Sequence, residues 1–411
     1  MRTIRCIVVG IVVLVAAAPA LAQHDTSTGH KEGQEKPDTG VVFRFDDHPS
    51  LRFGEIARLD GLATFQLDWH QWPSAGSPSS WELQQARVGI SGRLLKRVDY
   101  ELERELTDGT DAWRDAFVGV DIHRSLLQVR AGHFKIPFSL DQLTGVTDLD
   151  FAYRSLAGSS LAPGRDVGVA AHGRFLGRAV HYKAGIFRRV GENGKTLAAR
   201  ATVSPWHSTA NSPLRNLTIG AGFTDGHLSE GLNSVNGRTV SDERLFPKIY
   251  VNGRRRRIGG DAEWREGSFG LRAELIRVVD ERLGQGTDDN DLPPARAMGG
   301  YLSGTWILTG EKKSDDVRPR HPLQRGGIGA IELAARFEFL SFGSNGSGEI
   351  SNGPRAARLP GLESRVLTAG VNWYLNRFVR LQANVIREQR LEGGVVESPL
   401  WTRIIRLQVG L

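Results

Sequence analysis

The sequence predicts an all-β protein, a transmembrane antiparallel β-barrel of about 16 strands. Three observations support this prediction. A secretory signal precedes the mature chain, segments of alternating apolar and polar residues run to the last residue, and no second apolar run approaches the length of a spanning helix. A barrel strand alternates lipid-facing apolar and lumen-facing polar residues, so it never builds a continuous apolar run.

The N-terminus has the three parts of a secretory signal peptide. Arg2 and Arg5 precede an apolar run from Ile7 to Ala18, and the small-residue site Ala20-Leu21-Ala22 follows. The apolar run is shorter than the roughly 20 residues that a spanning helix needs, which favours a cleaved signal over a membrane anchor. We therefore expect residues 1–22 to be removed.

The composition of the mature chain excludes several classes of protein. The single cysteine, Cys6, lies in the signal, so the mature chain has neither disulfides nor Cys-ligated metal. Removal of Arg2 and Arg5 leaves 51 Lys and Arg (53 − 2) against 46 Asp and Glu, a net charge of +5 (51 − 46). This excess is spread along the chain without a basic tail or a nucleic-acid motif, so no nucleic-acid partner is expected.

Residues 23–50 are expected to form a flexible periplasmic segment. The stretch from His24 to Thr39 is polar, rich in turn formers and without aromatic residues. His24 and His30 could bind a metal, but nothing nearby completes a site, so a solvated tail is favoured. Because no linker appears further along, we expect residues 51–411 to form one barrel domain.

The barrel region divides into segments with a period of two, most of them nine to thirteen residues long, the length that a tilted strand needs to cross a bilayer. An even count near sixteen is typical of a porin-sized barrel with an aqueous channel. The expected strands are 55–70, 81–94, 98–107, 112–121, 126–136, 166–176, 178–188, 197–205, 214–224, 254–266, 268–279, 297–309, 326–340, 364–376, 377–389 and 400–411.

The alternation is clear near the C-terminus. One face carries Val379, Leu381, Ala383 and Val385, and the other carries Arg380, Gln382 and Asn384. A soluble β-sandwich gives the same alternation, so connection lengths have to decide. Short links at Gly177 and Asn376-Arg377 alternate with long polar ones at 225–253, 280–296 and 310–325. Outer-membrane barrels show this asymmetry, with tight periplasmic turns and longer outside loops.

Several segments together resemble a known family, the phosphate- and pyrophosphate-selective porins O and P, over most of the mature chain. They are Val129 to Leu140 (VRAGHFKIPFSL), Pro163 to Val169 (PGRDVGV), Thr305 to Glu311 (TWILTGE), Glu332 to Phe337 (ELAARF) and Gly370 to Asn376 (GVNWYLN). Each is weak alone, but their order and separations make the resemblance specific.

The resemblance implies a sixteen-stranded outer-membrane barrel, usually a homotrimer, whose third outside loop folds inward to narrow the pore. That loop corresponds to residues 137–164. It follows a strand that ends at Pro137, which cannot donate to a ladder. Barrels of this kind usually end on an aromatic residue that the assembly machinery recognises, whereas this chain ends on Leu411. The barrel-assembly machinery, acting through the C-terminal strand, is nevertheless an expected partner.

Basic residues on the water-facing parity predict an anion path, because guanidinium groups bind phosphate oxygens bidentately and stay charged. Strand positions of this kind are Arg87, Arg93, Arg130, Arg174, Lys183, Arg200, Arg272, Arg336, Arg380 and Arg406, and the inner loop adds Arg154 and Arg165 with Lys135 at its base. The predicted anion path and constriction consist of Arg87, Arg93, Arg130, Lys135, Arg154, Arg165, Arg336 and Arg380.

Acidic residues on the same parity keep other functions open. They are Asp68, Glu101, Glu103, Glu105, Asp115, Glu274, Glu332 and Glu338. Many of these groups could form salt bridges across strands, so a general, weakly selective porin stays an alternative to passive diffusion of phosphate or polyphosphate. A non-conducting structural or adhesive barrel is a third possibility.

No motif predicts an enzyme, a cofactor or a metal site. The sequence has no G-x-S-x-G elbow, no P-loop and no metal-spaced His cluster, and His133, His172 and His181 are scattered over three expected strands. The run from Arg254 to Arg257 could gather anions at a pore mouth or contact the phosphates of lipopolysaccharide, an expected partner together with outer-membrane lipid.

Overall fold

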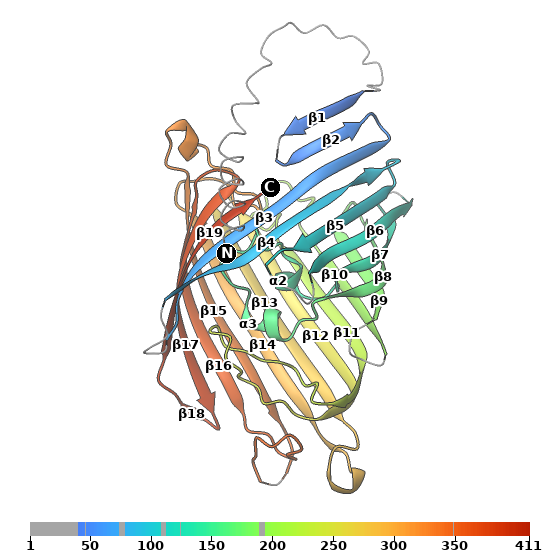
Figure 1. Ribbon diagram of the computed structural model, residues 1–411, viewed down its shortest axis with the longest axis vertical. Helices are drawn as coiled ribbons and strands as arrows, with labels where there is room; N and C mark the ends of the chain where they lie inside the picture. The colour runs from blue at the N-terminus through green and yellow to red at the C-terminus, as the bar shows by residue number, and fades with distance from the viewer. Residues whose placement is uncertain are drawn as a thin grey trace, which may run out of the picture.

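In the computed structural model of the protein, the described residues are 40–45, 47–73, 79–107, 112–123, 125–188, 194–347 and 349–411. Within this part of the chain, sixteen strands form a closed antiparallel barrel, shown in Figure 1. Each strand pairs with its neighbour in sequence, and β19 pairs with both β17 and β3 to close the barrel. The predicted fold class is therefore confirmed.

All sixteen predicted strands are present. Their bounds are β3 (Ala57–Gln71), β4 (Ser80–Leu94), β5 (Val98–Glu105), β6 (Trp113–His123), β7 (Leu127–Lys135), β8 (Arg165–Phe175), β9 (Val180–Arg188), β10 (Lys195–Val203), β11 (Thr218–Gly231), β12 (Val251–Glu266), β13 (Phe269–Arg282), β14 (Leu292–Ile307), β15 (Ala330–Ser344), β16 (Leu362–Tyr374), β17 (Val379–Glu392) and β19 (Leu400–Gly410). The short β18 (Val395–Val396) pairs with the end of β17. Strands β11 to β17 extend further outward than predicted, because their outer residues pack inside the barrel instead of forming loops.

A hairpin of two further strands precedes the barrel. Strands β1 (Val41–Phe45) and β2 (Pro49–Phe53) pair with each other, and β2 pairs with the start of β3. Asp47 lies in the hairpin turn, and its Oδ1 accepts hydrogen bonds from the guanidinium groups of Arg318 at 2.9 Å and Arg377 at 2.8 Å. The flexible segment expected for residues 23–50 therefore gives way to strands from residue 41 onward. The expected signal and the start of that segment, residues 1–39, lie outside the described residues.

The two ends of the barrel differ in the length of their connections. Short turns at 95–97, 176–179, 267–268 and 375–378 lie at one end with the C-terminus, and long connections at 136–164, 232–250 and 345–361 lie at the other. The second end is therefore extracellular. The connection 308–329 corrects a prediction: it contains 310–325, which was grouped with the outside loops, yet it lies at the periplasmic end because β14 runs inward and β15 outward.

The third outside connection, residues 136–164, folds into the barrel as predicted and is called the inner loop below. It contains two short helices, α2 (Leu140–Leu143) and α3 (Leu156–Ser160), and α3 contacts β13, β14 and β15 (Figure 1). The side chains of Ser139 and Ser155 cap the two helices, because they accept hydrogen bonds from the backbone N–H groups of Gln142 and Gly158. No helix in the described ranges is long and apolar enough to cross a membrane.

Polar side chains of one wall hold the backbone of the inner loop. A loop without regular structure has unpaired N–H and C=O groups, which must find partners when buried. The wall supplies them from β10, β12, β13, β15, β16, β17 and β19. The contacts are Arg200 to Phe138 O, Glu274 to Leu140 N and Asp141 N, Glu338 to Leu156 N, Arg257 to Leu161 O, Asn372 to Asp150 O, Gln382 to Leu149 O, Asn384 to Ala152 N, and Arg380 and Gln408 to Thr147 O.

The extracellular half of the same wall is filled by an apolar core inside the barrel. Inward-facing wall residues pack against the inner loop and against the connection 232–250, which also folds inward. Members from the three parts include Phe138, Leu156 and Leu161, then Phe246 and Ile249, then Ile276, Leu340, Phe342 and Ile386. This corrects the expectation that the inward set is polar throughout. Each fully buried side chain of this size stabilises the folded state by about 1.5–3 kcal/mol.

The periplasmic connection 308–329 holds the inner loop from the opposite end. Lys313 Nζ lies 2.5 Å from Asp150 Oδ1 of the inner loop and 2.5 Å from Glu332 Oε1 of β15. Burial alone would raise the pKa of Asp150, but the charges of Lys313 and Arg272 outweigh it and hold this pKa well below its ordinary value. Likewise, burial would lower the pKa of Lys313, but the neighbouring carboxylates raise it. Three separate segments therefore meet in one buried ionic cluster.

Substitution of Lys313 by Met should destabilise the barrel strongly. Removing one member of a buried ionic cluster leaves charge uncompensated, at a cost of about 3–5 kcal/mol; here Glu332 loses its cation, while Asp150 keeps Arg272 at 3.6 Å. The neighbouring Lys312 is exposed, so Lys312→Met is the matched control. Unfolding in urea, followed by the migration of heat-modifiable protein on gels, measures the difference. Equal stability of the two variants would show that the cluster does not hold the fold together.

The cluster also makes the stability depend on pH. Because the folded pKa of Asp150 is lowered, its contribution is present above the ordinary Asp pKa of about 3.9 and is lost as the pH falls toward the lowered folded value. Unfolding curves between pH 7 and pH 3 should show this loss, and Asp150→Asn should flatten it. The pKa of Asp148 is shifted in the opposite direction, because burial and then the charge of Asp315 raise it. Asp148→Asn should thus be at least as stable as the parent at pH 7, and a loss there would contradict the assignment.

Candidate functional site

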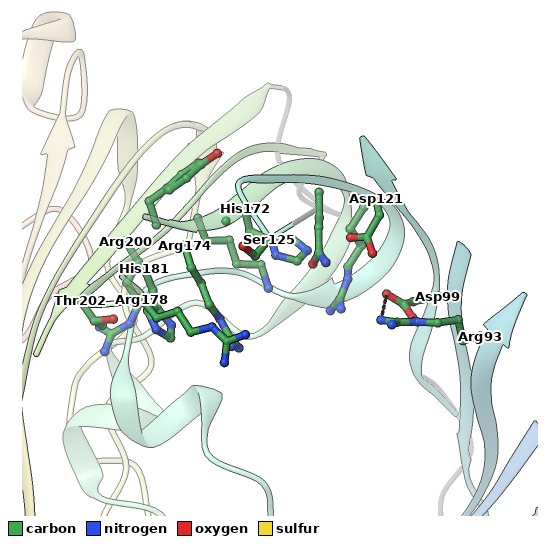
Figure 2. Close-up of a pocket in the computed structure, with 15 residues that line it drawn as sticks. Arg93, Asp99, Asp121, Ser125, His172, Arg174, Arg178, His181, Arg200 and Thr202 are labelled. Atoms are coloured by element: carbon green, nitrogen blue, oxygen red, sulfur yellow. Dashed lines mark hydrogen bonds and ion pairs between the residues drawn. The ribbon is translucent and has the colours of Figure 1, made fainter. Parts of the chain in front are cut away.

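The wall opposite the inner loop leaves space within the barrel. Because the inner loop lies against β10 to β19, space remains along the periplasmic part of the inward faces of β4 to β9, whereas a buried apolar cluster that includes Phe117, Phe134 and Phe187 fills the part beyond it. Two cavities of about 690 Å³ and 560 Å³ adjoin along this wall and share Arg93, Asp99 and Arg130. Both lie toward the periplasmic end, since residues of the short turns, among them Ser125, Arg178 and Lys96, line them. We call the larger cavity the basic vestibule; it is shown in Figure 2.

The basic vestibule carries a clear excess of positive charge. Six of its lining residues are Arg or Lys, two are His and two are Asp. These residues are Arg93, Arg130, Arg174, Arg178, Lys183 and Arg200, then His172 and His181, then Asp99 and Asp121. A cavity with low-dielectric walls concentrates such a field and attracts anions.

Two of these cations are already neutralised. Arg93 makes a bidentate pair with Asp99 at 2.6 and 3.1 Å, across the vestibule from Arg174 and His181 (Figure 2). Arg200 pairs with Asp261 at 2.6 and 2.8 Å and donates to Phe138 O as well. These groups position the wall and the inner loop, so they have little capacity left for a solute.

Arg130 and Lys183 are held by aromatic rings instead of carboxylates. The Arg130 guanidinium lies 3.6 Å from the centroid of Phe117, and Lys183 Nζ lies 5.4 Å from that of Phe134. Among the described residues neither side chain has a carboxylate within 4.0 Å, and Arg130 Nε has no hydrogen-bond partner. A cation–π contact orients a guanidinium without using its hydrogen-bond donors. Both groups can therefore donate to an anion in the vestibule.

The local sequence explains how the vestibule forms. Strands β8 and β9 are joined by the tight turn 176–179, where Gly177 has φ +62°. That turn fixes the register, so His172 lies opposite Lys183 and Arg174 lies opposite His181. The sequence interpretation treated the histidines as independent wall positions, but His172 and His181 line one cavity. The short link at Gly177 could have predicted that His172 and His181 lie close together, because a tight turn between two alternating strands sets which residues face each other.

The predicted constriction residues at the start of the inner loop do gather. Lys135 Nζ donates to Leu143 O at 3.1 Å and to Thr144 O at 2.9 Å, and Arg154 also donates to Thr144 O, at 2.9 Å. Burial lowers the pKa of Arg154; Asp141 opposes this shift, and repulsion from Arg165 and Arg87 adds to it. Four predicted residues thus share one region at the base of the inner loop.

Carboxylates balance the charge of that region. Arg165 pairs with Asp115 at 2.6 Å, and Arg87 pairs with Glu105 at 2.7 Å. Glu101 and Glu103 line the same face of β5, and Glu103 lies 3.8 Å from Arg87. The constriction region is therefore nearly neutral, in contrast to the basic vestibule next to it.

The remaining predicted residues lie elsewhere. Arg336 is buried beneath the inner loop, 3.1 Å from Glu338 and stacked at 4.5 and 4.3 Å on Phe151 and Tyr153. Arg380 is buried too, and donates to Thr147 O at 2.8 Å and Gln408 Oε1 at 3.1 Å. The structure thus places Arg93 and Arg130 in the vestibule, and Arg336 and Arg380 in contacts that anchor the inner loop.

Solved structures of outer-membrane proteins share this fold. The outer-membrane protein OmpT of Vibrio cholerae superposes with a TM-score of 0.57 at 11% identity, over 86% of this chain and 98% of that chain. An anion-selective porin from Comamonas acidovorans superposes with a TM-score of 0.54 at 12% identity, over 86% of this chain and 100% of that chain. The outer-membrane channel DcaP of Acinetobacter baumannii superposes with a TM-score of 0.56 at 9% identity, over 86% of this chain and 97% of that chain. At these identities the likeness concerns the fold.

Sequence comparison identifies the family. An uncharacterised protein of Caulobacter vibrioides is 26% identical over 285 residues, which cover 64% of this chain and 56% of that protein. The chain thus matches little more than half the length of this relative. The family model described as phosphate-selective porin O and P matches residues 73–408. With a closed sixteen-stranded barrel in the described ranges and a match over most of its length, this chain belongs to the phosphate-selective porin O and P family and is an outer-membrane β-barrel.

Proposed function

We propose that this porin gives passive diffusion of small anions across the outer membrane, with phosphate or polyphosphate as favoured solutes. The observation that carries the proposal is the basic vestibule, in which Arg130 and Lys183 keep their donors available beside a surplus of positive charge. The family description and the anion-selective Comamonas acidovorans porin support it. Family and fold favour a channel over an enzyme.

The proposed path has two parts with different tasks. Anions pass between the inner loop and β4 to β8, where Arg87, Lys135, Arg154 and Arg165 alternate with carboxylates that prevent tight binding. They then reach the basic vestibule, where several cations share the solute. A pore must bind a solute well enough to admit it and weakly enough to release it, which several shared contacts achieve better than one deep pocket.

A general, weakly selective porin is the second candidate. It is favoured by the ion pairs Arg165–Asp115 and Arg87–Glu105, because opposed charges across a constriction create a field that orients solutes of either sign. A non-conducting barrel is a third outcome, motivated by the apolar core in the extracellular half. Bilayer recordings distinguish all three: anion-selective current blocked by phosphate, current of low selectivity, or no channel steps.

Three further proposals concern assembly and processing. We propose a homotrimer, since OmpT of Vibrio cholerae has been solved in a trimer form. We also propose that residues 1–22 are removed on export and that the barrel-assembly machinery engages β19, whose last residues pair with β3. Mass spectrometry of the mature protein and of the intact oligomer tests the first two directly.

Substituting Arg130 or Lys183 by Gln should lower the anion preference. At about 8 Å in a water-filled space, one unit charge contributes about 0.5 kcal/mol, a factor of roughly two in the permeability ratio. The permeability ratio of anions to cations should therefore fall about fourfold in the double variant, and the fall should be smaller in high salt. Reversal potentials in a KCl gradient measure the ratio. The matched control is Arg188→Gln on the exposed outward face of β9, and Arg130→Lys, which keeps the charge, should retain the selectivity. A parental ratio in the double variant would contradict this location of the path.

Inorganic phosphate should block the chloride current in a concentration-dependent manner. Phosphate offers several acceptor oxygens to Arg130 and Lys183, whereas chloride offers a single centre, so phosphate should reside longer. The half-blocking concentration in planar bilayers should rise several-fold in the Arg130→Gln/Lys183→Gln variant but not in Arg188→Gln. Anion-selective current that phosphate leaves unchanged would favour general anion permeation.

A further inference from the structure

The lipid-facing wall of β12 to β16 has different residues at its two ends. At the periplasmic end the outward residues are aromatic, including Phe269, Trp306 and Trp373, with Phe269 stacked on Trp306 at 5.8 Å. At the extracellular end they include several arginines, beside the carboxylates Glu281 and Glu363. Aromatic side chains suit any membrane interface, whereas a cluster of cations suits a leaflet with anionic headgroups. The wall is therefore matched to two different leaflets.

Three of these arginines form a triangle around Val279. In the strand register, Arg256 on β12 and Arg296 on β14 lie opposite Val279 on β13, one on either side. Arg277 lies two residues before Val279 on β13, closer to the periplasm. The run from Arg254 to Arg257 divides by parity, so Arg254 and Arg256 face outward while Arg255 and Arg257 face inward. With a strand spacing of about 4.8 Å and about 6.6 Å per two residues, neighbouring Cα atoms of the triangle lie about 8 Å apart.

The charge of this triangle is largely uncompensated. Arg277 and Arg296 are exposed, and in the described part of the chain neither has an ion-pair partner within 4.0 Å. Arg256 lies 3.6 Å from Asp225, with half of its side chain exposed. By contrast, Arg365 on β16 is paired with Glu363 at 2.6 Å, and Arg403 on β19 donates to Gln71 at 2.7 Å. The triangle thus has capacity for an external anion.

An apolar groove begins directly beneath the triangle. Its volume is about 430 Å³, and its lining includes Gly260, Ala273, Leu275, Gly300 and Phe337. Leu275 is two residues from Arg277 toward the periplasm and lies between Gly260 and Gly300 in register. A Cβ at Gly300 would meet Glu274 O at 2.7 Å, so the backbone there admits no side chain. Leu275 and Phe339 cover Gly300, whereas Gly260 on the other side of Leu275 is exposed, so a shallow furrow remains beside Leu275.

We propose that the triangle and the groove together bind one lipid with a phosphorylated headgroup in the outer leaflet, of the lipopolysaccharide class. The guanidinium groups of Arg256, Arg277 and Arg296 hold the phosphate, and the groove takes one acyl chain. Arginine suits this task because its planar fork binds phosphate bidentately and stays charged. A second copy of this chain fits less well, since juxtaposed like charges repel. The site depends on the outer-membrane location and is independent of the proposed solute.

Lipid retention by the purified, folded porin tests the headgroup contact. Native mass spectrometry would compare the parent with Arg256→Gln/Arg277→Gln/Arg296→Gln after exposure to bisphosphorylated lipid A. We expect the triple variant to bind roughly tenfold more weakly, because several charge-assisted contacts are lost. The matched control is Arg365→Gln/Arg387→Gln/Arg403→Gln, which removes the same charge from β16, β17 and β19. Equal losses in the two triple variants would overturn the proposal in favour of non-specific attraction.

Further arms separate the possible ligands. Dephosphorylated lipid A should bind weakly, and binding as tight as that of the phosphorylated form would overturn the proposal. Inorganic phosphate should compete poorly, because it cannot use the groove; full competition at equal concentration would point to a simple anion site instead. Ala273→Phe, which fills the groove without changing charge, should also weaken lipid binding several-fold. Efficient cross-linking between subunits through position 277 would show that this face is a subunit contact. None of these outcomes alters the selectivity measured for Arg130→Gln.

Discussion

The buried contact of Lys313 with Asp150 and Glu332 is the interaction on which the interior arrangement depends. It joins the periplasmic connection, the inner loop and the wall strand β15, which are far apart in sequence. The cluster adds to the hydrogen bonds and the apolar core that also hold the inner loop to the wall. Together these contacts keep the loop against β10 to β19, so space remains along the opposite wall. The location of the basic vestibule is thus a consequence of contacts on the other side of the barrel.

Arginine has two distinct roles inside this barrel, and the surroundings of each side chain decide which applies. Arg200, Arg336 and Arg380 lie beneath the inner loop, where carboxylates and backbone carbonyls use their donors. Arg130 lies against Phe117, which holds the guanidinium by its face and leaves its edges available. Water-facing parity is common to all four. What separates a structural arginine from Arg130, which keeps its donors available, is the presence of a loop above it.

The sequence was sufficient for the barrel and insufficient for its interior. Period-two alternation located all sixteen strands, because lipid on one side and the lumen on the other impose a strict parity. It missed β1 and β2, which lie outside the bilayer, and it misplaced the connection 308–329, since loop length alone does not reveal which end a loop occupies. It also predicted a polar lumen-facing set, whereas Ile276 and Leu340 face inward and pack in an apolar core whose other members come from loops with no periodicity. Lys135, Arg154 and Arg165 were grouped correctly because they flank one loop, whereas Arg336 was not, because its neighbours are distant in sequence.

The N-terminal hairpin spans the junction at which the two ends of the barrel meet. Strand β2 extends the sheet from β3, on one side of the β19–β3 pairing, while Asp47 reaches Arg377 in the turn between β16 and β17, on the other side. Phe45 adds a contact with Phe378 at 5.9 Å. The side chains of the hairpin therefore act as a clasp that adds to the β19–β3 strand pairing. Because the clasp joins the two sides of the β19–β3 pairing, it favours retention of the closed cylinder over opening at that pairing.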